Sequence, residues 1–125
     1  MEYLLIIPGR LDNLNDYINA CRSKREIGNR LKQENEAVVK AAITRCLRGV
    51  RIQKKVRMEY LWVEKNQRRD LDNISSFGRK VIQDELVKSR ILQNDGWANI
   101  IGFSDSFAVD KQDPRIEVRI IEVDE

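Results

Sequence analysis

Hydrophobic and polar positions change their spacing along this chain, and each spacing predicts a type of element. Residues 3–7 form a short apolar run closed by Pro8 and Gly9, which predicts a buried strand followed by a turn. Residues 27–47 carry apolar side chains at steps of three and four, which predicts a helix with a basic outer surface. Residues 11–22 are ambiguous, because helical spacing is mixed with Asp and Asn residues that favour loops and caps.

The middle of the chain predicts a strand, a loop and a second helix. Residues 51–63 alternate between apolar and mostly basic side chains, which predicts a long strand with one packed face and one basic face. Residues 64–69 form a polar loop. Helical spacing then begins at Asp72 or Asn73 and continues to Ser89, which predicts a second clear helix.

The last part of the chain predicts two strands. Residues 99–109 and 115–123 have strand character, and the polar segment 110–114 between them favours a hairpin turn. The predicted order is therefore β-α-α-β-α-β-β, an α+β (mixed α/β) fold with helices packed on a small mixed sheet. The length of 125 residues, without repeats or linkers, predicts a single domain covering residues 1–125.

Composition narrows the chemistry that this chain can perform. It contains no histidine, which excludes catalytic triads and metal sites built on that residue. Its two cysteines, Cys21 and Cys46, are too few for a zinc site or a disulfide scaffold, and we expect them to be reduced core residues. No apolar run approaches the ~20 residues that cross a membrane, and residues 1–7 lack the features of a signal peptide. We therefore expect a cytoplasmic protein.

The net charge of +3 hides an uneven distribution along the chain. Residues 22–69 carry fifteen Lys and Arg against five acids, whereas residues 70–125 carry seven against twelve. A basic segment followed by an acidic one is expected if one part binds phosphate and another gathers carboxylates. The alternative is a solvated basic helix beside a charged strand, with no such function.

Two aspartates, Asp70 and Asp72, lie where the polar loop runs into the second helix. In extended backbone, side chains two residues apart point the same way, so both carboxylates could face one ion. A hard cation such as Mg²⁺ would relieve their repulsion and also bind phosphate oxygens. The alternative is helix capping, since Asp is favoured at the N-cap and near the positive end of the helix dipole. Arg68 and Arg69 could bind phosphate there or only solubilise the loop.

Asp95 and Lys80 are two further candidates for the same site. Asp95 lies in an Asn-Asp-Gly turn after the second helix, and the returning chain could bring it towards the other aspartates. The same turn is also ordinary loop chemistry. Lys80 could project towards a bound phosphate, or it could pair with Asp84 at the i,i+4 spacing on the helix surface.

These residues resemble the RusA-type Holliday junction resolvases. The specific part of the resemblance is the run Arg69-Asp70-Leu71-Asp72-Asn73, a following helix that bears Lys80, and Asn94-Asp95. Residues 13–17 also resemble an Asn-rich segment that the family has after its first strand. The order of elements is similar over nearly the whole chain. The longer form of the motif is most similar to members from phages and prophages of Gram-positive bacteria.

The resemblance implies a Mg²⁺-dependent endonuclease, with Mn²⁺ as the alternative metal, that acts as a homodimer on four-way DNA. It implies that Lys80 assists catalysis and that Arg69 helps to hold DNA. The implied metal ligands are Asp70, Asp72 and Asp95. The family lysine often lies about one turn after the second aspartate, where this chain has Ser76. Either four extra residues lengthen the start of the helix, or the role of the lysine is lost.

The predicted partners are branched DNA and a second copy of the chain, with no membrane. The expected DNA contacts are Lys55, Arg57, Arg68, Arg69 and Asn73. The two-fold symmetry of a junction favours a C2 dimer, for which the candidate contacts include Phe103, Phe107 and Ile121. The main alternative is a non-catalytic nucleic-acid-binding recombination accessory protein, in which Asp70 and Asp72 only cap a helix. A metal-dependent nuclease for RNA or flap substrates is a third hypothesis.

Overall fold

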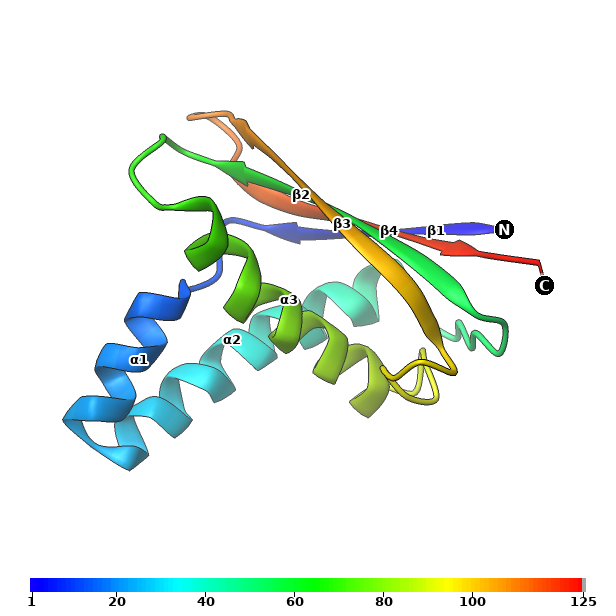
Figure 1. The fold of residues 1–125 in the computed structure, drawn as a ribbon, viewed down its shortest axis with the longest axis horizontal. Coiled ribbons are helices and arrows are strands. Elements are labelled where there is room, and N and C mark those ends of the chain that lie inside the picture. Colours follow the sequence, from blue (N-terminus) through cyan, green and yellow to red (C-terminus); the bar gives the residue numbers. More distant parts are fainter. Residues whose placement is uncertain (125) are drawn as a thin grey trace.

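A four-stranded sheet, with three helices on one side of it, makes up the computed structural model, which describes residues 1–124 (Figure 1). The helices are α1 (Leu14–Ser23), α2 (Arg25–Cys46) and α3 (Leu71–Lys88). The strands are β1 (Glu2–Pro8), β2 (Val56–Glu64), β3 (Ile100–Val109) and β4 (Arg115–Glu122). The order of these elements confirms the predicted α+β fold. Among residues 1–124, no helix has both the length and the apolar sequence that a membrane-spanning helix needs.

The sheet has the strand order β1-β4-β2-β3. β4 runs antiparallel to both of its neighbours, whereas β3 runs parallel to β2 at the edge. The predicted hairpin between the last two strands is therefore wrong, because β2 lies between β3 and β4. The connecting segment bonds to the ends of other strands: the Asp110 N–H donates to the Glu64 carbonyl at 2.8 Å, and the Gly9 N–H donates to the Pro114 carbonyl at 2.9 Å.

The hydrophobic core lies between the helices and the facing side of the sheet. Alternate residues of the two central strands point into it, as the pleat of a strand requires. These buried side chains are Val56, Met58, Tyr60 and Trp62 on β2, and Ile116, Val118 and Ile120 on β4. α2 and α3 supply the opposing layer, which includes Val39, Ile43, Val81, Ile82 and Leu86. The other face of the sheet is not covered by any element among residues 1–124 (Figure 1).

The strand predicted for residues 51–63 is shorter than expected, because β2 begins at Val56. Ile52 makes only an isolated bridge with Leu92, in the segment that follows α3. Its side chain is buried among exposed polar neighbours. The alternation at residues 51–55 therefore came from one buried residue in an irregular connection and not from a continuous strand.

The ambiguous segment after β1 forms a short loop followed by α1. Asn13 is the N-cap of this helix: its side-chain oxygen accepts from the Asp16 N–H at 2.8 Å. In return, the Asp16 carboxylate accepts from the Asn13 N–H at 3.0 Å, which completes a capping box. The Asn and Asp residues that favoured a loop are thus the residues that start the helix.

Both cysteines are free, as predicted, but only one is partly buried. Cys46 lies at the edge of the core, whereas Cys21 is exposed, so the prediction of a core position for Cys21 is wrong. A Cβ atom at Gly28 would overlap the Cys21 sulfur. The glycine at this position on α2 therefore allows α1 to approach closely, and the cysteine packs at that crossing although much of it faces solvent.

Candidate active site

Asp70 and Asp72 lie at the start of α3, where the loop after β2 ends. Asp70 is the N-cap residue, with φ −70° and ψ 145°, but its side chain accepts no capping hydrogen bond. Asp72 lies in the first helical turn, where a negative charge suits the helix dipole. Neither carboxylate has a hydrogen bond or an ion pair with another residue of the described chain. Their oxygen atoms are therefore available to bind a cation, and Asp70 does not serve as a side-chain cap.

The extended backbone expected at both Asp70 and Asp72 is present at only one of them. α3 begins at Leu71, slightly earlier than predicted, so Asp72 already has a helical backbone. The rule that side chains two residues apart share a side holds for extended backbone, and here only Asp70 is extended. The two aspartates still share one end of the helix, but they do not form an extended pair.

Lys80 lies further along α3 and brings two other acids together. Its ammonium nitrogen is 3.0 Å from Asp84 Oδ1 and 3.6 Å from Asp95 Oδ2. The hydrogen bond to Asp84, together with the charges of Asp84 and Asp95, raises the pKa of Lys80. The segment after α3 thus returns Asp95 to this helix, beside Lys80. The sequence alone predicts Asp84 only as a surface partner of Lys80, and the i,i+4 spacing of the two residues is the available signal.

The candidate acids therefore fall into two groups within one chain. Asp72 and Lys80 are eight residues apart, which is about 12 Å along a helix axis. Residues 1–124 contain no cluster of three or more Asp, Glu or Cys side chains that could hold a metal ion. Asp70 and Asp72 fit Mg²⁺ by donor type, since this ion often takes one or two carboxylates together with substrate phosphate oxygens. The structure does not bring Asp95 to them within one chain.

The guanidinium of Arg69 is bound by acceptors of the protein itself. It donates to the Leu11 carbonyl at 2.9 Å and lies 3.4 Å from Asp16 and 3.5 Å from Glu64. Its side chain is only 15% exposed. Arg69 therefore ties the loop before α3 to the start of α1 and to the end of β2. The residue that the resemblance implied as a DNA contact lies where it fixes the backbone next to Asp70.

The other predicted DNA contacts lie in three places. Arg68 is exposed and Asn73 partly exposed, and both flank the two aspartates at the start of α3. Arg57 lies on the sheet face that points away from the helices, 3.9 Å from Glu59. Lys55 precedes β2 at the opposite end of that strand. The structure therefore groups Arg68 and Asn73 with the candidate acids and places Lys55 and Arg57 elsewhere.

A known protein family matches a part of the chain that includes both groups of acids. The family model described as Endodeoxyribonuclease RusA matches residues 4–121, nearly the whole chain. The chain belongs to the RusA endodeoxyribonuclease family. No curated protein matches it significantly. Family membership supports the predicted resemblance and indicates a nuclease that cuts DNA within a strand.

In this RusA-family chain, α3 is fixed on the sheet by a polar network that the sequence did not predict. Asp105 on β3 accepts from the Trp62 indole N–H at 2.9 Å and from Arg79 at 2.6 Å. The Arg79 guanidinium also lies 4.3 Å from the centre of the Phe103 ring. Because Arg79 precedes Lys80 on the helix, these contacts fix the rotation that presents Lys80. Only the parallel pairing of β2 with β3 brings these residues together, so no local pattern could have revealed them.

Proposed function

We propose that this RusA-family chain is a Mg²⁺-dependent, structure-selective endonuclease that resolves four-way DNA junctions during recombination and repair, with Mn²⁺ as the alternative metal. The observation that carries the proposal is the pair of unpartnered carboxylates, Asp70 and Asp72, beside the exposed Arg68. Phosphodiester hydrolysis without histidine needs another source of water activation and charge neutralisation, and carboxylate-bound metal ions provide both.

Each candidate residue has a proposed role. Asp70 and Asp72 would hold the ion. Asp95, the third ligand that the resemblance implies, lies beside Lys80 and not beside these two acids within one chain. The ion supplies activation of water and neutralisation of charge on the scissile phosphate. Lys80 is 63% exposed and its pKa is raised, so it would place a positive charge towards the phosphate at neutral pH. Arg68 and Asn73 would contact the DNA backbone beside the acids.

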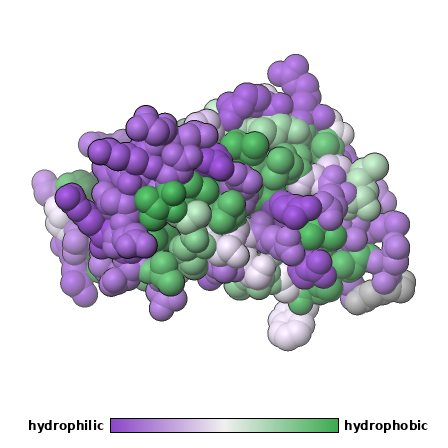
Figure 2. All heavy atoms as spheres, turned by 90° about the horizontal axis from the view of Figure 1, so that it is seen from above, coloured by the Kyte–Doolittle hydropathy of each residue, from purple (hydrophilic) through white to green (hydrophobic). Residues whose placement is uncertain are grey.

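We also propose that two copies form a C2 dimer, because paired symmetric nicks need two sites and residues 1–124 of one chain offer a single candidate site. The uncovered sheet face has apolar patches between hydrophilic regions (Figure 2). Leu4 and Ile6 on this face are 48% and 37% exposed. Among the contacts predicted from sequence, Phe103 on the edge strand is 51% exposed, whereas Phe107 is partly buried.

Junction cleavage tests the proposed function. We expect the full chain to nick a synthetic four-way junction at symmetric positions in Mg²⁺ and to lose this activity in EDTA. Asp70→Asn should bind the junction without cutting it. Asp124→Asn removes a carboxylate that is 94% exposed near the end of the chain, and should cut normally. No cleavage in either Mg²⁺ or Mn²⁺ would refute the proposal.

A substrate comparison separates this proposal from the other hypotheses. Junction, duplex, single-stranded DNA and RNA should be cleaved at clearly different rates, with the junction fastest. Faster cleavage of RNA or of flap substrates would favour the third hypothesis. Junction binding that never leads to cleavage would favour the accessory protein. That hypothesis expects Asp70 and Asp72 to cap a helix, and neither side chain makes a capping contact among the described residues.

A further inference from the structure

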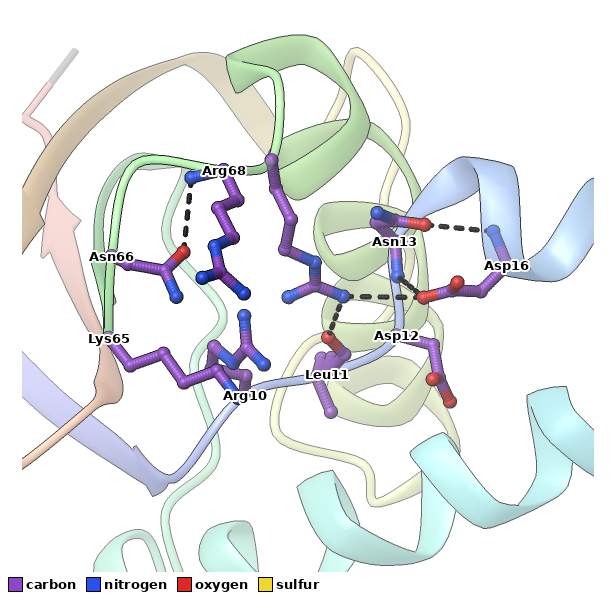
Figure 3. Close-up of a pocket in the computed structure, with 9 residues that line it drawn as sticks. Arg10, Leu11, Asp12, Asn13, Asp16, Lys65, Asn66 and Arg68 are labelled. Atoms are coloured by element: carbon purple, nitrogen blue, oxygen red, sulfur yellow. Dashed lines mark hydrogen bonds and ion pairs between the residues drawn. The ribbon is translucent and has the colours of Figure 1, made fainter. Parts of the chain in front are cut away.

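A pocket of about 570 Å³ lies between the end of β1, the start of α1 and the loop that follows β2 (Figure 3). Its volume is within the range of ~300–1,000 Å³ that is typical of ligand sites. Four cationic side chains line it: Arg10, Lys65, Arg68 and Arg69. The pocket is on the same loop as Asp70 but does not include that residue.

The positive charge of this pocket is only partly neutralised by the protein. Glu64, which is buried, accepts from Arg10 at 3.2 Å and from Arg69 at 3.5 Å. The side chains of Arg68 and Lys65 have no ion pair or hydrogen bond with any residue from 1 to 124. Figure 3 shows the side chains of Arg10, Lys65 and Arg68 converging on the same space.

The acids that line the pocket lie on its α1 side and already have partners (Figure 3). Asp12 accepts from the side-chain amide of Asn35 at 2.7 Å. Asp16 accepts from the Asn13 N–H and from Arg69. The opposite wall therefore keeps an excess of positive charge, and converging like charges are stabilised when an anion lies between them.

We propose that Arg10, Lys65 and Arg68 together bind one phosphate group of the DNA backbone in this pocket. Guanidinium groups match the oxygens of a phosphate in paired hydrogen bonds, and a lysine adds a point charge. This inference rests on the proposed function and adds a backbone-binding subsite to it. Arg68 precedes Asp70 by two residues, so this subsite lies next to the end of the loop that carries the candidate acids.

The salt dependence of junction binding tests this subsite. Binding is measured in EDTA, to prevent cleavage, for the wild type, for Arg68→Gln, and for the double variant Lys65→Gln/Arg68→Gln. The slope of log K against log salt concentration is negative, and one lost phosphate contact should reduce its magnitude by about 0.9. Because both residues bind the same phosphate, the double variant should lose one contact and not two.

Arg90→Gln is the matched control. Arg90 is also an exposed arginine in a loop, but it follows the far end of α3. It should leave the slope unchanged. A double variant that behaves like this control would overturn the subsite. So would a double variant that loses two contacts, since it would show two separate phosphates. Circular dichroism and melting temperature check that each variant is folded.

A second measurement keeps this inference separate from the proposed function. At constant ionic strength, inorganic phosphate in place of chloride should raise the melting temperature of the wild type more than that of the double variant. If the wild type fails to bind junctions, the proposed function fails and this measurement alone decides whether the pocket binds phosphate. Stabilisation by phosphate that is lost in the double variant, with an unchanged DNA slope, would assign the pocket to free phosphate and overturn the DNA subsite.

Discussion

Asp70 is the residue at which a structural and a catalytic role can be separated most clearly. Its carboxylate makes no capping bond, so Asp70→Ala should change the free energy of unfolding by less than about 0.5 kcal/mol. Asn13→Ala removes a complete capping box from α1 and should cost about 1 kcal/mol. Urea denaturation of both variants measures the difference. An equal loss in the two variants would show that Asp70 supports the helix after all.

In the proposed function, Asp84 positions Lys80, and replacing Asp84 should therefore change the pH dependence of cleavage. Its hydrogen bond raises the pKa of Lys80, so Asp84→Asn should lower that pKa towards the ordinary lysine value. The raised pKa means that the favourable charge of Lys80 is present at neutral pH and is lost as the pH rises through the folded-state value. The cleavage rate, measured as a function of pH, should therefore begin to fall at a lower pH in Asp84→Asn than in the wild type.

Asp84→Glu serves as the conservative control for this effect, because it keeps the acidic group that faces the lysine. In Asp84→Glu, the fall in cleavage rate at high pH should return to nearly the pH at which it occurs in the wild type. If the cleavage rate of Asp84→Asn falls at the same high pH as that of the wild type, the charge state of Lys80 does not limit cleavage at high pH.

At the scale of elements, the contact between α3 and β2 depends on a glycine. A Cβ atom at Gly78 would lie 2.7 Å from Trp62 Cζ3 and 2.9 Å from Cη2. Trp62 is 1% exposed and its indole N–H is bonded to Asp105, so the ring cannot easily move. Gly78→Ala gains up to about 1 kcal/mol of helix propensity, but overpacking costs about 1–3 kcal/mol.

We therefore expect Gly78→Ala to lower the free energy of unfolding, by up to about 2 kcal/mol. Gly102→Ala is the control, because nothing lies within 4 Å of a Cβ atom built at that position. It should leave stability nearly unchanged. Thermal or urea denaturation compares the two variants, and a more stable Gly78→Ala protein would contradict the tight contact with Trp62.

Local sequence patterns predicted the helices and strands better than they predicted which strands pair. The three- and four-residue steps located α2 and α3 to within a few residues, because each helix buries one continuous stripe. The strand character of residues 99–109 and 115–123 located β3 and β4 but not their pairing, since a strand has the same pattern whichever neighbour it bonds. The insertion of β2 between them follows from long-range hydrogen bonds that no segment encodes by itself.

The same limit applies to the candidate site. The Asp-Leu-Asp run identified the start of α3 as chemically unusual, and the structure leaves both of its carboxylates unpartnered. Contacts between distant parts of the chain decide how the other candidate residues are placed. Arg69 and Arg68 look alike in sequence, yet one is enclosed by Glu64, Asp16 and a carbonyl while the other faces solvent. Their difference is set by the approach of α1 to the loop after β2.

At the scale of the whole molecule, one face of the sheet is packed and the other is not. The uncovered face combines the exposed apolar residues Leu4 and Ile6 with ion pairs such as Arg119 to Glu2 at 2.7 Å. Its acids and bases balance one another, so this face is less suited to bind a DNA backbone than the cationic pocket beside the start of α1. A self-associating surface fits this mixture of apolar and paired charged residues better.

This arrangement predicts that the uncovered sheet face forms the dimer. The wild type should sediment as a dimer at micromolar concentration, and Leu4→Glu should dissociate it, because a charge would be buried at the centre of the contact. Val38→Glu on α2 is the matched control, since Val38 is 43% exposed against 48% for Leu4.

Phe103→Glu tests the edge strand β3 in the same way. Dissociation by Phe103→Glu with an intact Leu4→Glu dimer would move the interface to that edge. In either case, the monomeric variant should nick only one strand of a junction per encounter, because the second cut requires the second copy.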